Sequence, residues 1–222
     1  MDNKILKNIL QVVVAILLLF ILLLTGVRML LTDTFVTVEY GMPYFPEDNY
    51  GMSQEERLGM ASFALAYLLN AEDITFLEEV SFADGTPAYN DRELRHMVDV
   101  KVLTQSVLKG WYWSLGVFAG LAAWAWFGGW WNDFRKMLSV GGVFTVVLLG
   151  TLVFLVFLNF NQVFTSFHHL FFEGDSWLFL YSDTLIRLFP IRFWQDAFTF
   201  VGVFTFVLGL GIWRWAPVRI KS

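Results

Sequence analysis

The chain has 222 residues and no cysteine; 57% of its residues are hydrophobic, only 16% are charged, and the formal net charge is −5. A soluble domain carries about a quarter charged residues, so this composition excludes a soluble cytoplasmic enzyme. The lack of cysteine excludes disulfide scaffolds, thiolate metal sites and cysteine nucleophiles. The length suits one membrane domain over residues 1–222.

Four uncharged apolar runs follow one another along the chain, and a helix needs roughly 20 apolar residues to cross a bilayer core. The runs predict transmembrane helices at about residues 9–30, 110–131, 137–160 and 197–213. The first is interpreted as an uncleaved anchor, because it is longer than the apolar region of a signal peptide and no small-residue cleavage site follows. We therefore predict an all-α integral membrane protein with four spans.

The distribution of Lys and Arg predicts the orientation of the spans. The N-terminal tail, the link at residues 132–136 and the C-terminal tail together hold seven basic and two acidic residues. The rest of the chain holds eight basic and eighteen acidic residues. Both termini are therefore expected in the cytoplasm, with two structured loops on the outer side of the membrane, at about residues 31–109 and 161–196.

The first outer loop begins with several local structure signals. Residues 34–40 alternate loosely between polar and apolar side chains, which predicts a short strand. The pattern Ser53-x-x-Glu56 matches a capping box and predicts a helix that runs to about Asn70. The loop is therefore expected to be folded rather than a linker.

The rest of the outer sequence predicts a turn, a helix and an interfacial segment. Asp84 and Gly85 suggest the turn of a small hairpin, and from Asp91 the pattern is helical and continues into the second span. The second loop is almost as apolar as a span but is interrupted by polar and helix-breaking residues. It is expected to lie at the outer membrane interface.

All three histidines fall in the outer loops. On a helix, His96 and Asp99 share a face at i, i+3, and an aspartate beside a histidine can fix its tautomer. His168 and His169 open the second loop. One interpretation is a histidine pair, one from each loop, that meets at the membrane surface; the other is interfacial histidines that only form hydrogen bonds.

Other kinds of site have less support. His96, His168, His169, Asp99 and Glu173 could in principle hold a metal, but no His-Glu-x-x-His spacing exists. No Gly-x-Ser-x-Gly elbow is present either. We expect no metal, no cofactor and no acyl-enzyme.

Basic residues of the outer loops divide into two groups. Arg187 and Arg192 lie in an apolar stretch and are expected to bind lipid phosphate or glycerol oxygens. For Arg57, Arg92 and Arg95 a solvated face or a local ion pair is favoured. The exposed side of the chain is acidic, so no nucleic acid is expected as a partner.

The arrangement resembles the bacterial lipoprotein intramolecular transacylase family (Lit), a group of four-span membrane proteins. The resemblance covers nearly the whole chain in span number, loop lengths and order. Its motifs are Glu-Leu-Arg-His-Met-Val-Asp-Val-Lys around His96, Phe-His-x-Leu-Phe-Phe around His168, Trp177, Asp183-x-Leu-Ile186, Leu-Phe-Pro190 and Phe193.

The resemblance implies an enzyme that moves the sn-2 acyl chain of a diacylglyceryl-modified lipoprotein to its N-terminal amine, giving the N-acyl, S-monoacylglyceryl lyso form. Donor and acceptor lie on one molecule, so proximity supplies much of the rate. We expect His96 and His168 to be the acid/base pair, with Asp99 orienting His96. Candidate oxyanion donors are Arg95, Lys101, Tyr40 and Tyr50. His169, Trp177 and Arg187 are further candidates for substrate binding.

Two other hypotheses are compatible with the sequence. The protein could be a non-catalytic membrane assembly or transport protein, although no span has a charge at its middle. It could also be a metal-dependent membrane hydrolase, which a chelator would inactivate. Under the transacylase hypothesis the partners are the lipoprotein and membrane phospholipid, and the enzyme acts as a monomer.

Overall fold

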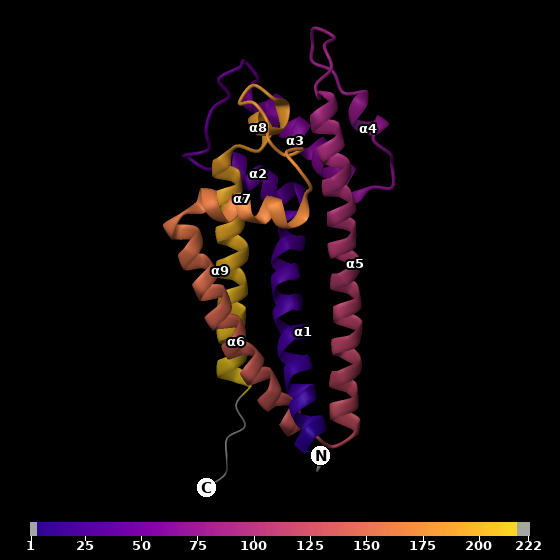
Figure 1. Cartoon of the computed structure of the whole chain (residues 1–222), viewed down its shortest axis with the longest axis vertical. Coiled ribbons are helices and arrows are strands. Elements are labelled where there is room, and N and C mark those ends of the chain that lie inside the picture. Colours follow the sequence, from indigo (N-terminus) through magenta and orange to yellow (C-terminus); the bar gives the residue numbers. More distant parts are fainter. Residues whose placement is uncertain (1–3, 217–222) are drawn as a thin grey trace. The chain divides into compact units, whose positions relative to one another are not determined.

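The computed structural model describes residues 4–216, and Figure 1 traces its helices from indigo to yellow along the chain. This described part contains no β-strand, and a single isolated bridge pairs Ser81 with Pro87. The predicted all-helical class is therefore confirmed. The helices are α1 (Lys4–Leu30), α2 (Asp33–Tyr40), α3 (Gln54–Leu69), α4 (Thr75–Glu78), α5 (Asp91–Phe127), α6 (Trp131–Leu158), α7 (Phe160–Phe171), α8 (Thr184–Leu188) and α9 (Ile191–Trp215).

The chain falls into two compact units. Among the described residues, the span unit comprises residues 4–28, 108–158 and 198–216, and the loop unit comprises residues 29–107 and 159–197. The two ranges of the loop unit coincide closely with the two predicted outer loops. Both histidine motifs lie in the loop unit, so the candidate site is contained within one of the two units.

Three helices in the described residues are long and apolar enough to cross a membrane: α1, α6 and α9. They correspond to the first, third and fourth predicted spans. The span unit packs around Val14, Phe134 and Met137, which are almost fully buried. Glycines allow α6 and α9 to approach closely, because a Cβ on Gly142 would lie 2.8 Å from the carbonyl oxygen of Gly209.

The second predicted span forms the last part of α5, but α5 is not among the helices that are long and apolar enough to cross a membrane. Its apolar part is rich in Trp, Tyr and Gly rather than in Leu and Val. Indole and phenol rings carry polar groups and favour the membrane interface, so they lower the mean hydropathy. The presence of a helix here is confirmed, whereas the count of four spans stays a prediction.

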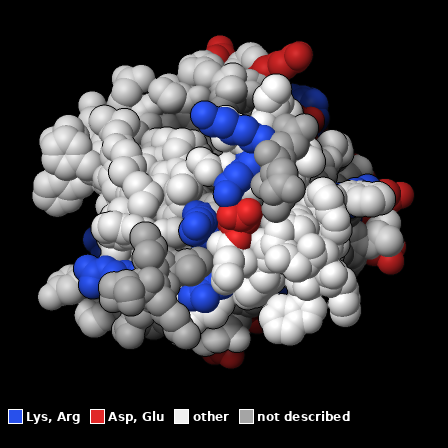
Figure 2. All heavy atoms as spheres, turned by 90° about the horizontal axis from the view of Figure 1, so that it is seen from below, with Lys and Arg blue, Asp and Glu red and all other residues white. Residues whose placement is uncertain are grey.

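Basic residues gather on one face of the structure. Figure 2, a view from below, shows Lys and Arg side chains around an acidic group. Within the span unit, Lys7 forms an ion pair with Asp133 at 2.6 Å, and Arg135 donates a hydrogen bond to the carbonyl oxygen of Trp215. These two contacts join the N-terminal segment, the link at residues 132–136 and the C-terminal segment, which are the three basic pieces predicted on the cytoplasmic side.

The strand expected at residues 34–40 is wrong, because this segment forms helix α2. Thr32 caps the helix by accepting a hydrogen bond from the backbone nitrogen of Phe35 at 3.2 Å. Val36 and Tyr40 lie one turn apart and are both buried in one cluster with residues of α3. Packing at helical spacing therefore outweighs the β-propensity of the valines and threonines in this segment.

The capping box and the turn predicted in the loop unit are confirmed. Ser53 and Glu56 form the capping box at the start of α3, and Asn70 ends this helix. Asp84 and Gly85 form a turn in which Gly85 has a φ of +84°, a left-handed conformation that glycine tolerates. The hairpin around this turn is reduced to the single bridge mentioned above.

Candidate active site

The first turn of α5 is anchored by a buried carboxylate. Glu93 accepts a hydrogen bond from the backbone nitrogen of Asn90 at 2.9 Å, while the Asn90 side chain caps the nitrogens of Arg92 and Glu93. The other oxygen of Glu93 accepts from the backbone nitrogen of Leu185 at 2.7 Å. Glu93 is 1% exposed, so it ties the start of α5 to the start of α8 and fixes the residues one turn later, including His96.

Helix α7 positions the second histidine. The Nδ1 of His168 lies 2.8 Å from the carbonyl oxygen of Phe164, one turn earlier in the same helix. A carbonyl oxygen only accepts, so Nδ1 carries the hydrogen and donates it. In the neutral ring, Nε2 is then the unprotonated nitrogen that can accept a proton.

The two helices bring His96 and His168 together. Their ring centroids are 6.3 Å apart, and the ring planes differ by only 20°. Each side chain is 8% exposed. The Nδ1 of His96 is buried and has no hydrogen-bond partner among the described residues, so one nitrogen of this ring is still without a partner.

Aromatic side chains surround the histidine pair. Phe172 lies 4.9 Å from the ring of His96 and 5.6 Å from that of His168. Phe179 contacts His96 at 5.3 Å, and Trp177 contacts His168 at 4.7 Å. These three residues come from the apolar segment that follows α7, so the second outer loop supplies the walls of the site.

The apolar surroundings keep the histidines neutral. Burial, with a smaller contribution from the nearby His168, lowers the pKa of His96 to about 4. Burial also lowers the pKa of His168, although its hydrogen bond to Phe164 acts in the opposite direction and His169 adds to the lowering. At neutral pH both rings are therefore uncharged and able to accept a proton.

Asp99 and His169, which the sequence grouped with these two histidines, are exposed instead of buried beside them. Asp99 is exposed on α5, and the unpartnered Nδ1 of His96 shows that no carboxylate orients the ring through this atom. His169 is exposed, with its ring 5.3 Å from Trp177. Of the adjacent histidines, the buried His168 is the one that lies against His96.

Two predicted oxyanion donors are instead part of the packing. The hydroxyl of Tyr40 donates to the carbonyl oxygen of Leu188 at 2.6 Å, and the ring is 2% exposed. The Nζ of Lys101 donates to the side chain of Asn70 and to the carbonyl oxygen of Glu72, at 2.8 and 2.6 Å. Both groups already have acceptors within the loop unit, so the geometry does not support a substrate-binding role for them.

Arg187 is held by an ion pair rather than left free for a ligand. It makes two 3.0 Å contacts to the carboxylate of Asp48, which is almost fully buried. Tyr50 lies beneath its guanidinium at 5.5 Å and is about half exposed. Buried Arg57 donates to the carbonyl oxygens of Arg187 and Pro46. This group could not be predicted from the sequence, because no short spacing connects its members.

Arg192 likewise pairs with Asp196 at 2.6 Å, one turn apart on α9. The geometry therefore assigns a local partner to each of the two arginines expected to bind lipid phosphate. The carboxylates of Asp48 and Asp196 therefore already balance the charges of Arg187 and Arg192 without a lipid phosphate.

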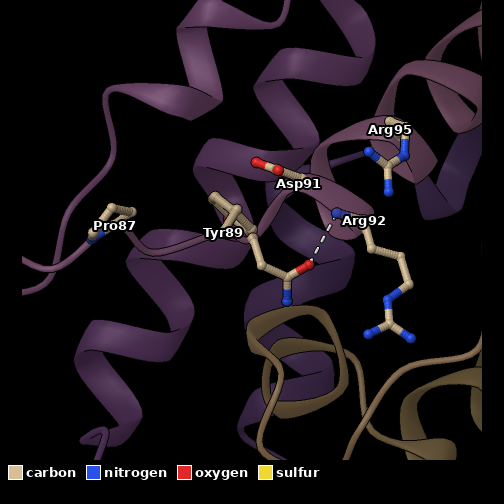
Figure 3. A pocket seen from close by; sticks show the side chains of 6 residues that line it. Pro87, Tyr89, Asp91, Arg92 and Arg95 are labelled. Atoms are coloured by element: carbon tan, nitrogen blue, oxygen red, sulfur yellow. Dashed lines mark hydrogen bonds between the residues drawn. The ribbon is translucent and has the colours of Figure 1, made fainter.

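Two arginines that line an open cavity lie at the start of α5. A shallow cavity of about 710 Å³ is lined by Arg92 and Arg95 together with Pro87 and residues 89–91. Figure 3 shows both guanidiniums projecting from the first turns of the helix, with the Asn90 side chain bonded to the backbone nitrogen of Arg92. Arg92 also donates to the carbonyl oxygen of Leu178 at 3.0 Å, which links the helix to the segment that carries Trp177.

The described residues contain no group of three or more His, Cys, Asp or Glu side chains that could hold a metal ion. The histidine pair instead offers a neutral base within aromatic walls. Such an arrangement can move a proton between a nucleophile and a leaving group that are held together between the rings.

Comparison with known proteins agrees with this picture. The sequence is 31% identical over 209 residues to a protein of Aquifex aeolicus (strain VF5) described as uncharacterized, covering 92% of this chain and 91% of the relative. The fold matches the in meso structure of the membrane integral lipoprotein intramolecular transacylase Lit from Bacillus cereus with a TM-score of 0.66, at 16% identity, over 96% of this chain and 97% of that one.

A second structure of the Bacillus cereus protein, with one histidine replaced by arginine, matches with a TM-score of 0.63 at 17% identity, over 95% of this chain and 92% of that one. The family description "Lipoprotein intramolecular transacylase Lit" matches residues 12–194. This match covers most of the chain, including both histidine motifs. The chain therefore belongs to the lipoprotein intramolecular transacylase family, Lit.

Proposed function

We propose that this protein converts a diacylglyceryl-modified lipoprotein into its lyso form by moving the sn-2 acyl chain to the N-terminal amine. The observation that carries the proposal is the buried, nearly parallel pair of His96 and His168 within aromatic walls. Membership of the Lit family supplies the substrate class.

The reaction requires no group from the enzyme to become covalently attached. The neutral amine of the lipidated cysteine attacks the carbonyl carbon of the sn-2 ester, and a C–N bond forms. The resulting tetrahedral oxyanion collapses, the C–O bond to glycerol breaks, and an amide remains. One proton leaves the amine and one reaches the glycerol oxygen, so the balance is a single proton transfer between two atoms of the same substrate.

The histidine pair is suited to carry this proton. His168 has its Nδ1 occupied by the Phe164 carbonyl, so its free Nε2 accepts the proton as the C–N bond forms. The same ring, or His96, then donates the proton to the departing glycerol oxygen. Burial favours the neutral form of both rings, so a base is available without prior deprotonation.

The proposal extends to location and partners. The enzyme acts in the bacterial cell membrane with both termini in the cytoplasm and the loop unit outside, in contact with phospholipid and the lipoprotein. The support is the positive charge of the terminal segments and of the α5–α6 link. The proposed residues all belong to one chain, so a monomer suffices.

His96→Ala and His168→Ala are expected to abolish the lyso-form product, because each removes a ring that moves the proton. General acid–base groups typically contribute 10²–10⁴-fold, so a loss of at least about 100-fold in rate is expected. The variants are expressed in a host that otherwise makes only diacyl lipoproteins, and the N-terminal lipopeptide is analysed by mass spectrometry.

His169→Ala is the matched control, since this neighbouring ring is exposed, whereas His168 is buried. It is expected to retain most of the product. Undiminished lyso-form lipoprotein from both the His96 and the His168 variants would refute the mechanism. Unchanged lipoprotein lipids with the wild-type protein would refute the activity.

A further inference from the structure

The proposed reaction passes through an oxyanion, and the structure leaves one buried donor beside the histidines without an acceptor. The indole Nε1 of Trp177 has no hydrogen-bond partner among the described residues, and it is shielded from solvent. Trp177 itself is 9% exposed. An indole nitrogen can only donate, and buried donors in native proteins nearly always have acceptors. We propose that Trp177 donates this hydrogen bond to the carbonyl oxygen of the transferring acyl group and stabilises the oxyanion.

The position of Trp177 fits this role. Its ring lies 4.7 Å from that of His168 and is tilted by 35°. In the tetrahedral intermediate, the attacking nitrogen and the oxyanion are bonded to the same carbon. A base that takes the proton from this nitrogen and a donor that binds this oxygen must therefore be neighbours, as His168 and Trp177 are.

The geometry also separates Trp177 from the other candidate donors. The hydroxyl of Tyr40 and the Nζ of Lys101 already donate to oxygens of the loop unit. Arg95 is exposed in the cavity at the start of α5, and Tyr50 is about half exposed beneath Arg187. Trp177 combines a ring contact to His168, burial and an unused donor.

Trp177 lies in an irregular segment, because residues 172–183 form no helix. The segment is anchored at Leu178, whose carbonyl oxygen accepts from Arg92 at 3.0 Å. An uncharged donor also suits apolar surroundings, because it stabilises the oxyanion without requiring a buried charge in the resting enzyme.

The inference rests on the proposed function, and its test separates the two. Trp177→Phe keeps an aromatic ring but removes the N–H group. A second variant places benzothienylalanine at position 177, which keeps the two-ring shape and has sulfur in place of N–H. Both are expected to lower kcat about 10²–10³-fold, the range for loss of one oxyanion donor. KM is expected to change only a few-fold, because the bond is strongest in the transition state.

The assay uses the purified full-length protein in lipid with a synthetic diacylglyceryl-cysteine peptide. Trp194→Phe is the matched control. Trp194 is a partly buried Trp of the same unit, and its ring does not contact His96 or His168 in the described contacts. This variant is expected to keep the wild-type kcat. Infrared spectra of a substrate labelled with ¹³C at the sn-2 carbonyl supply a second measurement. The bound ester band is expected at a lower frequency in the wild type than in either Trp177 variant.

Each outcome decides one of the two statements. The role of Trp177 is overturned if the benzothienylalanine enzyme has the wild-type kcat and its bound ester band lies at the wild-type frequency. In that case, inactive His96 and His168 variants still support the proposed function. A rise in KM alone assigns Trp177 to binding or packing and also overturns the inference. Activity that survives His168→Ala refutes the proposed function itself.

Discussion

At the residue scale, a buried carboxyl outside the proposed mechanism has a raised pKa. Glu39 on α2 is 3% exposed, and one of its oxygens has no hydrogen-bond partner among the described residues. Burial, followed by the hydrogen bond and the charge of Asp196, raises the pKa of Glu39 to about 7, although Arg192 acts in the opposite direction. Glu39 is therefore protonated in mildly acidic solution, where an ordinary glutamate is charged.

This shift predicts that stability falls as the pH rises. The pKa of Glu39 is higher in the folded protein than in the unfolded chain, so its contribution is fully present below about pH 4.5 and is lost as the pH rises through about 7. Glu39→Gln is always neutral and is expected to remove this loss. Thermal unfolding in detergent at pH 5 and pH 8 is the measurement, and the gap in Tm is expected to shrink in the variant.

Glu47→Gln is the control, because Glu47 is exposed in the same unit. The difference between its Tm at pH 5 and at pH 8 is expected to match that of the wild type. An equal gap in the Glu39 variant would mean that other groups cause the pH dependence.

The sequence predicted the two histidines as the acid/base pair, whereas it predicted Trp177 only as one of several residues for substrate binding and not as an oxyanion donor. A histidine in each outer loop is a visible signal, because these side chains titrate near neutral pH. A tryptophan in a Trp-rich membrane protein is ordinary, and only its unpartnered nitrogen distinguishes Trp177 from the others nearby. The same limit explains the predicted roles of Tyr40 and Lys101, whose partners lie 148 and 31 residues away in the sequence.

At the element scale, the sequence predicts a helix reliably where a capping motif marks its start. It does not predict the conformation of a segment that depends on packing against other elements. The capping box at Ser53 depends on residues three apart, so it can be read directly from the sequence. The helical state of residues 33–40 depends on the cluster that Val36 and Tyr40 form with α3. Short segments rich in β-branched residues therefore need tertiary information.

The close contact between α6 and α9 leads to a prediction about stability. A methyl group on Gly142 would lie 2.8 Å from the carbonyl oxygen of Gly209 and 2.8 Å from the backbone nitrogen of Trp213. Gly142→Ala is thus expected to push the helices apart and to cost about 1–3 kcal/mol, as overpacking commonly does. At about 2–4 °C per kcal/mol for a chain of this length, Tm should fall by several degrees.

Gly211→Ala tests whether the effect comes from the contact rather than from helix propensity. Gly211 lies on the same helix α9, and a Cβ there has no neighbour within 4 Å. Its Tm is expected to stay equal or to rise slightly. A similar decrease in both variants would show that the α6–α9 contact is not limiting.

At the scale of the whole molecule, the number of spans depends on how aromatic residues are weighed. Long aliphatic runs predicted α1, α6 and α9 directly, because their length and composition are sufficient. The apolar part of α5 has four Trp residues, at positions 111, 113, 124 and 126, which suit a membrane interface but lower the hydropathy. A hydropathy scale alone therefore leaves the fourth span undecided, and an accessibility experiment is needed.

The cysteine-free chain makes this experiment simple, because one introduced cysteine is the only thiol. Asp175→Cys places it in the exposed second loop, and Asn132→Cys places it near the start of α6, after the predicted second span. In intact cells a membrane-impermeant maleimide is expected to label the first variant. The second is expected to react only after permeabilisation, because the positive-inside distribution puts this link in the cytoplasm.

Labelling of both variants in intact cells would contradict four spans with inner termini. Labelling of neither would place the loop unit on the wrong side for exported lipoproteins. Wild-type protein, which has no thiol, provides the background signal in each case.

The hydrogen bond from His168 to Phe164 gives the proposed base an unusual resistance to mutation. Its acceptor is a main-chain carbonyl, so every amino acid at position 164 presents the same oxygen while α7 stays helical. The tautomer of the ring is thus encoded by backbone geometry and not by a partner side chain. Substitutions around the site can reshape its walls for different acyl chains without disturbing the tautomer on which the chemistry depends.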